Sequence, residues 1–222
     1  RIKNISISTR KLKMRYEIKY AVDQLDLASI EASILMHPGS FSTAFPDRQV
    51  NNIYLDTPNL HCFYQNIEGV PRRQKMRLRW YGKMDSPQKK SILELKNKNA
   101  ELGWKDSFKI SNRLIDTKEE LLSAISEQPV RLGTLIPILH NSYHRKYYIS
   151  SDGLFRITID SEQSFKLPFS NMDALDLNRY PIIVELKYEA EYAELARDIM
   201  DYLPFRQTKN SKYTNGVTEL LF

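Results

Sequence analysis

Lys75, Arg77, Arg79, Tyr81 and Lys83 fall on every second position of the stretch QKMRLRWYGK, residues 74–83, and four of these five are basic. Large apolar residues fall between them, so a β-strand would send the cations to one face and the apolar groups to the other. Arginine can bind two phosphate oxygens at once through its planar fork, and lysine adds a point charge. The spacing therefore favours a surface that holds a phosphate-rich anion.

The same alternation recurs in four further segments, MRYEIKYAV, SILELKNK, LFRITID and IIVELKYEAE. A solvated sheet face usually mixes serine, threonine, lysine and glutamate, whereas these segments repeat charged residues in one phase. The charged residues in question are Arg15, Glu17, Lys19, Glu94, Lys96, Lys98, Arg156, Asp160, Glu185, Lys187 and Glu189.

Two structures would satisfy this pattern. The first is an antiparallel sheet with a charged face in solvent, which is the simpler explanation for any single strand. The second is a closed barrel with a charged interior and an apolar outer side under helices. Desolvated like charges cost several kcal/mol each, so such a lumen must be wet and must hold a polyanion. Five strands in the same phase favour the barrel.

The composition agrees with a folded protein that has an anionic partner. The 222 residues carry a formal net charge of +6, which points to nucleic acid, a phosphate-rich small molecule or a membrane surface. No apolar run approaches the roughly 18 residues of a spanning helix, and no signal peptide opens the chain. The single Cys62 excludes an internal disulfide and fits a reducing compartment. The chain begins at Arg1 without a methionine, so we expect flanking domains in a longer protein.

The elements predicted from the pattern make an α+β chain in which the sheet is the larger part. With NNIYLD, WKDSFKIS and YHRKYYIS, the alternating segments give seven or eight strands, mostly sequential and therefore antiparallel. No repeat or linker divides residues 1–222, which favours a single domain. Helices are predicted over 24–36 after an Asp23 N-cap, from Thr57-Pro58 to about Ile67, after a Thr117–Glu120 capping box, and over 190–202.

Eight short motifs then follow one another along the chain: RYEIKY (15–20), NIYLDTP (52–58), MRLRWYG (76–82), LELKNK (93–98), YHRKYY (143–148), FRITID (155–160), VELKYE (184–189) and KNSKYTNG (209–216). Together they resemble the VTC (vacuolar transporter chaperone) domain of the triphosphate tunnel metalloenzyme superfamily. The resemblance extends from about Met14 to Val217. It implies an eight-stranded antiparallel β-barrel, the triphosphate tunnel, with a charged lumen and helices packed outside.

The resemblance also implies an activity and a site. The best-known members transfer the terminal phosphate of a nucleoside triphosphate such as ATP onto a growing polyphosphate chain, using Mn²⁺ or Mg²⁺. Carried over by position, the catalytic cations would be Lys19, Arg77, Arg79, Lys96, Arg145 and Arg156. The substrate-binding residues would be Glu17, Glu94, Lys187, Lys209, Ser211 and Lys212, together with Lys105 or Lys109, which share one strand face. Glu185 matches the metal-binding glutamate.

One departure from the wider superfamily concerns the first strand. Many members begin with Glu-x-Glu-x-Lys, and here Arg15 replaces the first glutamate, so that only Glu17 and Lys19 remain. The replacement favours the polymerase-like branch over the adenylate-cyclase and thiamine-triphosphatase branch, and it leaves fewer carboxylates for a second metal. For Glu17 and Glu94, an internal ion pair explains the residue as well as a role beside the metal does.

Three other functions stay open at this level. Water could replace the polymer as acceptor, giving a tri- or polyphosphatase, or the domain could bind polyphosphate or inositol phosphates without turnover. Nucleic-acid binding ranks last and no such partner is expected, because the cationic faces carry few aromatics besides Tyr81. We expect a cytoplasmic domain, with association with a membrane protein at the inner face of a membrane through missing or separate segments.

Overall fold

Antiparallel strands form the larger part of the structure, a computed structural model that describes residues 14–83, 90–111, 115–129, 133–170, 175–176 and 180–222. The strands are β1 (Arg15–Val22), β2 (Ser42–Asp56), β3 (Arg72–Tyr81), β4 (Lys90–Asn99), β5 (Leu102–Ser111), β6 (Ile136–Ile149), β7 (Arg156–Lys166), β8 (Leu175–Asp176) and β9 (Ile182–Glu189). The helices are α1 (Leu27–Leu35), α2 (His61–Ile67), α3 (Lys118–Ser126), the 3₁₀ turn η1 (Ala190–Tyr192), α4 (Leu195–Asp201) and α5 (Lys212–Leu221).

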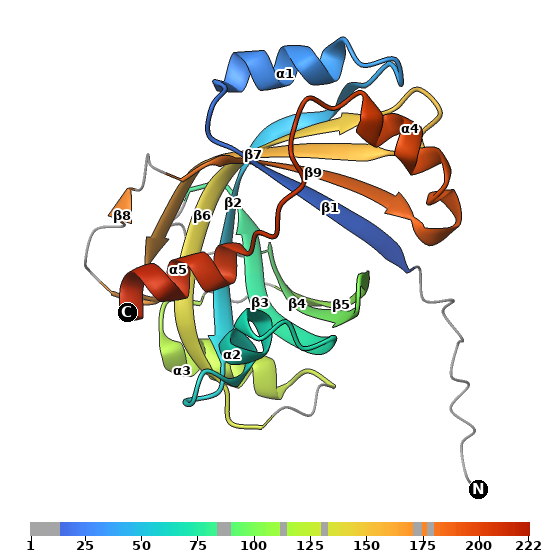
Figure 1. The fold of residues 1–222 in the computed structure, drawn as a ribbon. Helices are drawn as coiled ribbons and strands as arrows, with labels where there is room; N and C mark the ends of the chain where they lie inside the picture. Colours follow the sequence, from blue (N-terminus) through green and yellow to red (C-terminus); the bar gives the residue numbers. More distant parts are fainter. Residues whose placement is uncertain (1–13, 84–89, 112–114, 130–132, 171–174, 177–179) are drawn as a thin grey trace, which may run out of the picture.

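Eight of these strands close into a ring (Figure 1). They pair in the order β6-β2-β3-β4-β5-β1-β9-β7, and β6 pairs in turn with β7. Every pairing is antiparallel, and the two-residue β8 adds to β7. The predicted α+β class with eight antiparallel strands around a tunnel is therefore confirmed. The ring turns one face of each strand towards a shared interior.

The pairing between β5 and β1 is the shortest in the ring. Among the described residues, these strands share only the pair Arg15 and Gly103. The segment before α5 supports β1 instead, because the Thr208 amide donates to the Lys19 carbonyl over 2.8 Å. The Ala21 amide in turn donates to the Thr208 hydroxyl over 2.8 Å. The C-terminal segment thus completes the wall beside Lys19.

Apolar side chains on the outer face of the ring pack under helices. One cluster joins α1 and α4 to strands β7 and β9, and a second joins α3 to strands β2, β3 and β4. Burial of apolar surface contributes roughly 25 cal/mol per Å², and a one-residue slip of a strand would turn its apolar side chains to the interior. The outer packing therefore fixes which side chains point inward. Fully buried members include Ile30, Ile34, Leu93, Leu121, Ile157, Val184 and Leu186.

The last helix, α5, is absent from the sequence prediction and lies across the ring (Figure 1). Ser211 caps it by accepting a hydrogen bond from the Thr214 amide over 3.2 Å. The helix packs on Tyr54, Leu139 and Phe165, which have the strand phase of the inward-facing polar groups. One part of the interior is therefore filled by apolar side chains, beside the charged part that was predicted.

Three of the predicted helices differ from the prediction in their start or extent, and one cap is right. The helix α1 follows Asp26, whose carboxylate accepts from the Ser29 amide over 2.7 Å, and not Asp23. The helix predicted over 190–202 is divided into η1 and α4. The capping box of Thr117 and Glu120 is present as predicted.

The start of α2 is set by Asp56, a residue that the sequence analysis did not single out. Its buried carboxylate accepts hydrogen bonds from the amides of Cys62 and Phe63, both over 2.9 Å. It also accepts one from the Tyr213 hydroxyl of α5. A buried carboxylate needs such donors, so α2 begins at His61 and not directly after the predicted Thr-Pro pair. The same carboxylate ties α5 to β2.

Gly216 allows α5 to approach the strands, and an alanine there tests this packing. A Cβ at this position would lie 2.6 Å from Phe165 Cδ1 and 2.7 Å from Leu139 Cδ2, and both neighbours are fully buried. Gly216→Ala gains about 1 kcal/mol in helix propensity but loses about 1–3 kcal/mol through over-packing. We expect a net decrease of about 1 kcal/mol in the free energy of unfolding, measured in urea.

Thr218→Ala is the matched control, because Thr218 is exposed on the same helix. It changes helix propensity without adding atoms to the interior, so the free energy of unfolding should not fall. If Gly216→Ala were as stable as this control, the close approach of α5 to the strands would be contradicted.

Candidate functional site

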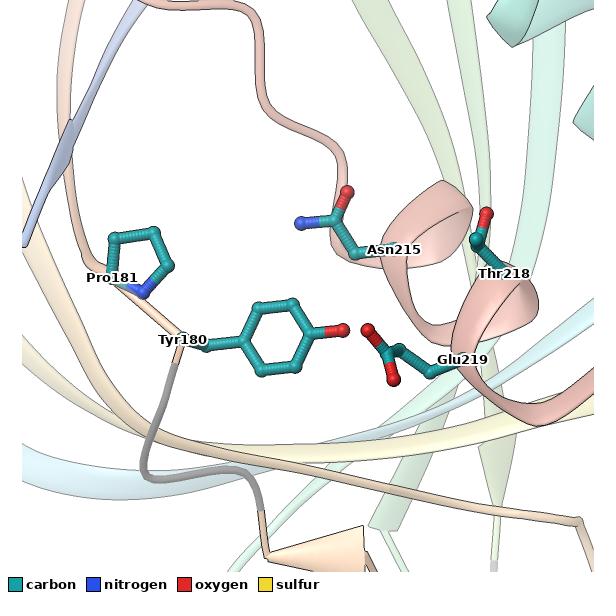
Figure 2. Close-up of a pocket in the computed structure, with 5 residues that line it drawn as sticks. All are labelled: Tyr180, Pro181, Asn215, Thr218 and Glu219. Carbon is teal, nitrogen blue, oxygen red and sulfur yellow. The ribbon is translucent and has the colours of Figure 1, made fainter. Parts of the chain in front are cut away.

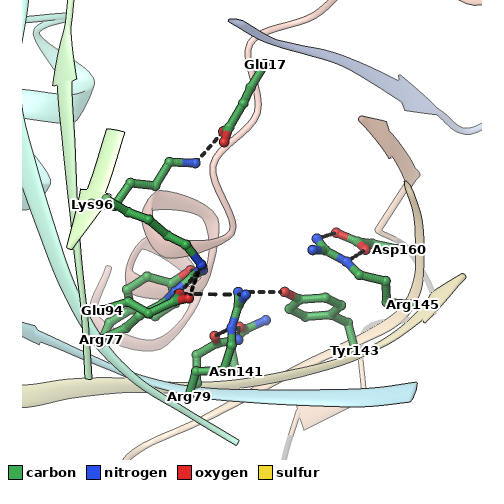
Figure 3. A network of polar contacts seen from close by, with 12 residues as sticks. Glu17, Arg77, Arg79, Glu94, Lys96, Asn141, Tyr143, Arg145 and Asp160 are labelled. Atoms are coloured by element: carbon green, nitrogen blue, oxygen red, sulfur yellow. Dashed lines mark hydrogen bonds and ion pairs between the residues drawn. The ribbon is translucent and has the colours of Figure 1, made fainter. Parts of the chain in front are cut away.

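Charged side chains from seven strands and α5 meet inside the ring. Figure 3 shows part of this arrangement, with Glu17, Lys96, Glu94, Arg77, Arg79, Arg145 and Asp160 directed towards a common space. We call the whole set the lumen network. Its cations outnumber its carboxylates, so the interior carries a surplus of positive charge. The cations are Lys19, Lys75, Arg77, Arg79, Lys96, Lys105, Arg145, Lys187 and Lys212, and the carboxylates are Glu17, Glu94, Asp160 and Glu185.

Glu94 is the centre of one side of the network. Arg77 donates to its Oε2 from Nε over 2.8 Å and contacts it through Nη2 at 2.7 Å. The Nη1 atom of Arg79 lies 3.6 Å away, and Lys105 Nζ lies 2.5 Å from Oε1. Burial favours the neutral acid, but these three cations outweigh burial and hold the pKa of Glu94 well below its usual range. For Glu94 the geometry supports the internal ion pair.

Asp160 holds the cations of the other side. Arg145 forms a bidentate pair with it, from Nε at 2.5 Å and from Nη2 at 2.7 Å, and Lys212 Nζ donates from α5 over 2.6 Å. Burial opposes ionisation, but Arg145 and Lys212 keep the pKa of Asp160 well below its usual range. The sequence analysis gave Asp160 no role. The alternation was the available signal, because Asp160 lies on the same face of the strand as Arg156.

Glu185, the predicted metal ligand, lies among cations. Lys187 Nζ is 2.7 Å from its Oε2, and Arg145 Nη2 is 3.8 Å from the same oxygen. Burial raises the pKa of Glu185, but Lys187, Lys19 and Lys96 outweigh burial and keep the pKa well below its ordinary value. Glu185 is therefore a buried, ionised carboxylate inside a cationic shell.

Glu17 forms an ion pair with Lys96 on β4, so it links two strands that are not neighbours in the ring. Arg15 Nη2 lies 3.0 Å from its other oxygen. Burial opposes ionisation of Glu17, but Lys96 and other cations bring its pKa to about 2. Arg15, the departure from the superfamily motif, thus pairs with the glutamate that remains.

Neutral polar groups orient the arginines. Arg79 donates from Nε to Asn52 Oδ1 over 2.9 Å and from Nη2 to the Tyr143 hydroxyl over 3.2 Å. Asn52 Nδ2 donates to Asn141 Oδ1 over 2.9 Å, while the buried Nδ2 of Asn141 has no hydrogen-bond partner in the described part of the chain. The sequence analysis missed all three residues. Their contact with Arg79 depends on strand register, which a single strand does not reveal.

The pKa values of Lys19 and Lys75 are lowered by burial and by neighbouring cations. Burial is the main reason that the pKa of Lys19 falls to about 8, with Glu185 opposing the fall and Lys96 adding to it. Burial and then Lys19 lower the pKa of Lys75 well below its ordinary value. Lys75 was not among the predicted site residues, although it has the strand phase of the arginines and donates to Ser211 Oγ over 2.8 Å. A bound anion would raise both pKa values, because it favours the charged form.

Four of the predicted site residues are not members of the network: Ser211, which accepts from Lys75 and caps α5, and three cations. Arg156, Lys109 and Lys209 are all exposed. Arg156 is the first residue of β7 and faces Lys187 in register, so it lies next to the network. Between the two candidates on β5, Lys105 contacts the network and Lys109 lies four residues farther along the strand. The alternation could not separate them because both occupy one face.

The donor set fits a divalent cation only if the substrate supplies further ligands. The described residues contain no group of three or more His, Cys, Asp or Glu that could hold a metal ion. Mg²⁺ is commonly bound by one or two carboxylates together with substrate phosphates. Glu185 offers one ionised carboxylate, and Thr158, its register partner on β7, has a buried Oγ1 without a hydrogen-bond partner in the described residues. These groups suit a metal that is shared with a phosphate chain.

A separate pocket of about 310 Å³ lies beside α5 (Figure 2). No cation is among the residues that line it, so it lacks the groups that bind phosphate. The candidate site is therefore the lumen. The pocket is lined by Tyr180, Pro181, Asn215, Thr218 and Glu219.

A family model of the VTC domain matches residues 14–221. The chain belongs to the VTC domain family. The match covers the strands of the ring, the segment beside β1 and all of α5, so every member of the lumen network lies inside this VTC domain. A search of curated proteins finds no match.

Comparison with solved structures shows a shared fold with the first protein below, and two others are less similar. A Vibrio parahaemolyticus protein with the provisional name adenylate cyclase has a TM-score of 0.60 and 15% identity, covering 94% of this chain and 99% of that one. A provisionally named adenylate cyclase of Bacillus halodurans has a TM-score of 0.49 and 14% identity, covering 90% and 96%. A Hippeastrum protein, provisionally named an adenylyl cyclase and described as having a dominant triphosphatase activity, has a TM-score of 0.48 and 12% identity, covering 94% and 97%.

The match to the VTC family model confirms the predicted resemblance to the VTC domain, and the Vibrio parahaemolyticus structure shares its fold. Membership indicates an enzyme that acts on triphosphates. No helix within the described ranges is both long and apolar enough to cross a membrane.

The pKa of Lys19 leads to a pH dependence of anion binding. As the pH rises through about 8, free Lys19 loses its proton and the lumen loses one positive charge. A hydrogen bond to a charged group contributes about 1.5–3 kcal/mol, so affinity for inorganic tripolyphosphate should fall by about tenfold between pH 7 and 9. Isothermal titration calorimetry without metal would measure this change.

Lys19→Arg is the control, because a guanidinium stays charged at pH 9. The ligand and Tyr143, whose pKa is lowered to about 8 by Arg145 and Arg79 against the effect of burial, titrate in both proteins. The difference between the two proteins therefore isolates Lys19. Identical pH profiles would show that Lys19 does not meet the anion.

Proposed function

We propose that this VTC domain is a polyphosphate polymerase, which transfers the terminal phosphate of a nucleoside triphosphate such as ATP onto inorganic polyphosphate. The observation that carries the proposal is the surplus of cations that converge on one lumen from six strands and α5. Phosphoryl transfer demands little covalent chemistry of a protein, and mainly requires positioning and neutralisation of the transferring group. A ring of fixed cations provides both.

The arginines are the groups that would hold the triphosphate. Arg77, Arg79 and Arg145 are already oriented by Glu94 and Asp160, so they do not have to reorganise when the anion arrives. Preorganised charge in a site of low dielectric is a large source of transition-state stabilisation. A guanidinium has five N–H donors, so each arginine keeps donors for phosphate oxygens while it remains paired.

The lysines would complete the cradle around the phosphate chain. Lys19, Lys96 and Lys187 come from β1, β4 and β9, and Lys212 comes from α5. Together with the arginines they surround the interior from several directions. A linear anion would then be held along its length, which suits a polymer better than a single phosphate group. Lys209 and Arg156, which are exposed, are proposed to guide the chain outside the lumen.

The metal, Mn²⁺ or Mg²⁺, would be held by Glu185 and by phosphate oxygens. When bound, such an ion polarises phosphoryl oxygens and neutralises developing charge. Thr158 Oγ1 is a neutral group beside this carboxylate that can orient it or a water molecule. Lys187, which is paired with Glu185 at 2.7 Å, would be released to contact phosphate.

Incubation of the purified protein with ATP and Mn²⁺, followed by gel separation and staining of long polyphosphate, tests the proposal. Formation of polymer and ADP is expected. Release of orthophosphate without polymer would instead assign water as the acceptor, and binding without turnover would assign a regulatory domain for polyphosphate or inositol phosphates. We expect the reaction to take place on the cytoplasmic side, where ATP is available.

Glu185→Gln tests the role of the buried carboxylate. The amide is nearly the same size but carries no charge, so the metal should lose its protein ligand while the cations stay. We expect the rate of ATP turnover to fall about a hundredfold or more, since a metal contributes several kcal/mol to the transition state. Binding of tripolyphosphate without metal should be kept or strengthened, because a negative charge leaves the lumen.

Glu191→Gln is the matched control, because Glu191 is exposed on η1. Its turnover should equal that of the wild type. Full activity of Glu185→Gln with either metal would remove Glu185 from the mechanism.

A further inference from the structure

An arginine surrounded by three aromatic rings lies at one end of the lumen. The guanidinium of Arg48 is 5.6 Å from the ring centre of Phe45, 5.3 Å from that of Tyr81 and 5.6 Å from that of Tyr147. Phe45 is 54% exposed and Tyr81 is 37% exposed, so parts of both rings face solvent. We call these four residues the mouth cluster. The proposed transfer of phosphate does not use them.

Strand register makes the mouth cluster continuous with the lumen network. Tyr147 follows Arg145 by two residues on β6, and Tyr81 follows Arg79 by two residues on β3. A strand rises about 3.3 Å per residue, which places each ring about 7 Å beyond its arginine on the same face. Arg48 also pairs directly with Arg145 across β2 and β6. The exposed rings therefore lie just outside the cations that would hold a triphosphate.

The cluster is built on rigid elements. Phe45 and Tyr147 meet edge to face with ring centres 5.8 Å apart. The backbone after Tyr81 is pinned to β2, because the Gly82 amide donates to the Gln49 carbonyl over 3.0 Å. A platform of this kind needs little ordering when a ligand arrives, and ordering is one of the main costs of binding.

The chemistry of the cluster selects its ligand. Among the ion pairs of the described residues none includes Arg48, so its charge faces aromatic rings and not a carboxylate. Exposed aromatic faces around a guanidinium plane are what nucleobases stack on, and the guanidinium can also donate to base oxygens or nitrogens. A further phosphate would gain nothing from the rings, and an aliphatic ligand would gain nothing from the charge.

We propose that the mouth cluster binds the base of the nucleoside triphosphate whose phosphates lie in the lumen. This inference rests on the proposed function and deepens it, because it names the nucleoside part of the substrate. The ribose would span the step of about 7 Å between the arginines and the rings. The cluster would thus distinguish a nucleoside triphosphate from inorganic tripolyphosphate, although the lumen treats the two alike.

Calorimetry with ATP and with inorganic tripolyphosphate tests the inference on the whole chain. Stacking of one base contributes about tenfold in affinity. The wild type should therefore bind ATP about tenfold more tightly than it would through phosphate contacts alone. Tyr81→Ala and Phe45→Ala should each weaken ATP binding by about fivefold to tenfold. Both variants should leave tripolyphosphate binding unchanged, which also shows that they are folded.

Two control variants separate stacking from other effects. Tyr81→Phe keeps the ring and should retain ATP affinity, while Tyr64→Ala removes an exposed ring of α2 outside the cluster and should change nothing. Equal loss for both ligands in Tyr81→Ala and Phe45→Ala, or no loss for either, overturns the base site. Absence of binding of both ligands to the wild type overturns the proposed function itself and this inference with it.

Discussion

Confinement of surplus positive charge within a ring of strands is the constraint on which the rest of this structure depends. Like charges on neighbouring strands repel one another, and burial makes the repulsion stronger. Burial is the main cause of the depressed pKa values of Lys19 and Lys75, and neighbouring lysines lower both further. The strands keep this arrangement because their opposite faces bury apolar side chains under α1, α3 and α4. The hydrophobic packing outside thus holds the charges inside.

Carboxylates reduce the repulsion between the cations without neutralising all of the positive charge. Glu94 and Asp160 each receive several cations, and each fixes at least one arginine in a defined orientation. Removing either one would leave buried guanidinium groups unpaired, which is costlier than the loss of a surface ion pair. The helix α5 contributes to the same balance through Lys212 while its apolar face fills part of the interior. Stability and the proposed anion binding therefore depend on the same residues.

This organisation suits chemistry in which the protein supplies position and charge. In the proposed function the ring surrounds a linear anion, and selectivity for a nucleoside would come from the mouth cluster, where the strands carry aromatic side chains. In this proposal the lumen network binds the phosphates and the mouth cluster binds the base. Glu185 differs from Asp160 because its closest partner is a lysine, which can move aside more easily than the bidentate arginine that holds Asp160.

The sequence by itself determined which face of each strand turns inward, because side chains alternate with a period of two, and Arg77, Arg79 and Lys96 follow from that rule. The family motifs added Lys212 and Glu185 to the predicted site, and alternation alone could not have distinguished them from other charged residues. Only the tertiary structure decided the partners, such as Asp160 for Arg145. It also decided depth along a strand, and the place of α5 across the ring. The ion-pair partners, the depth of a side chain along its strand and the position of α5 all depend on strand register and on contacts between residues far apart in the chain. No local period encodes these contacts.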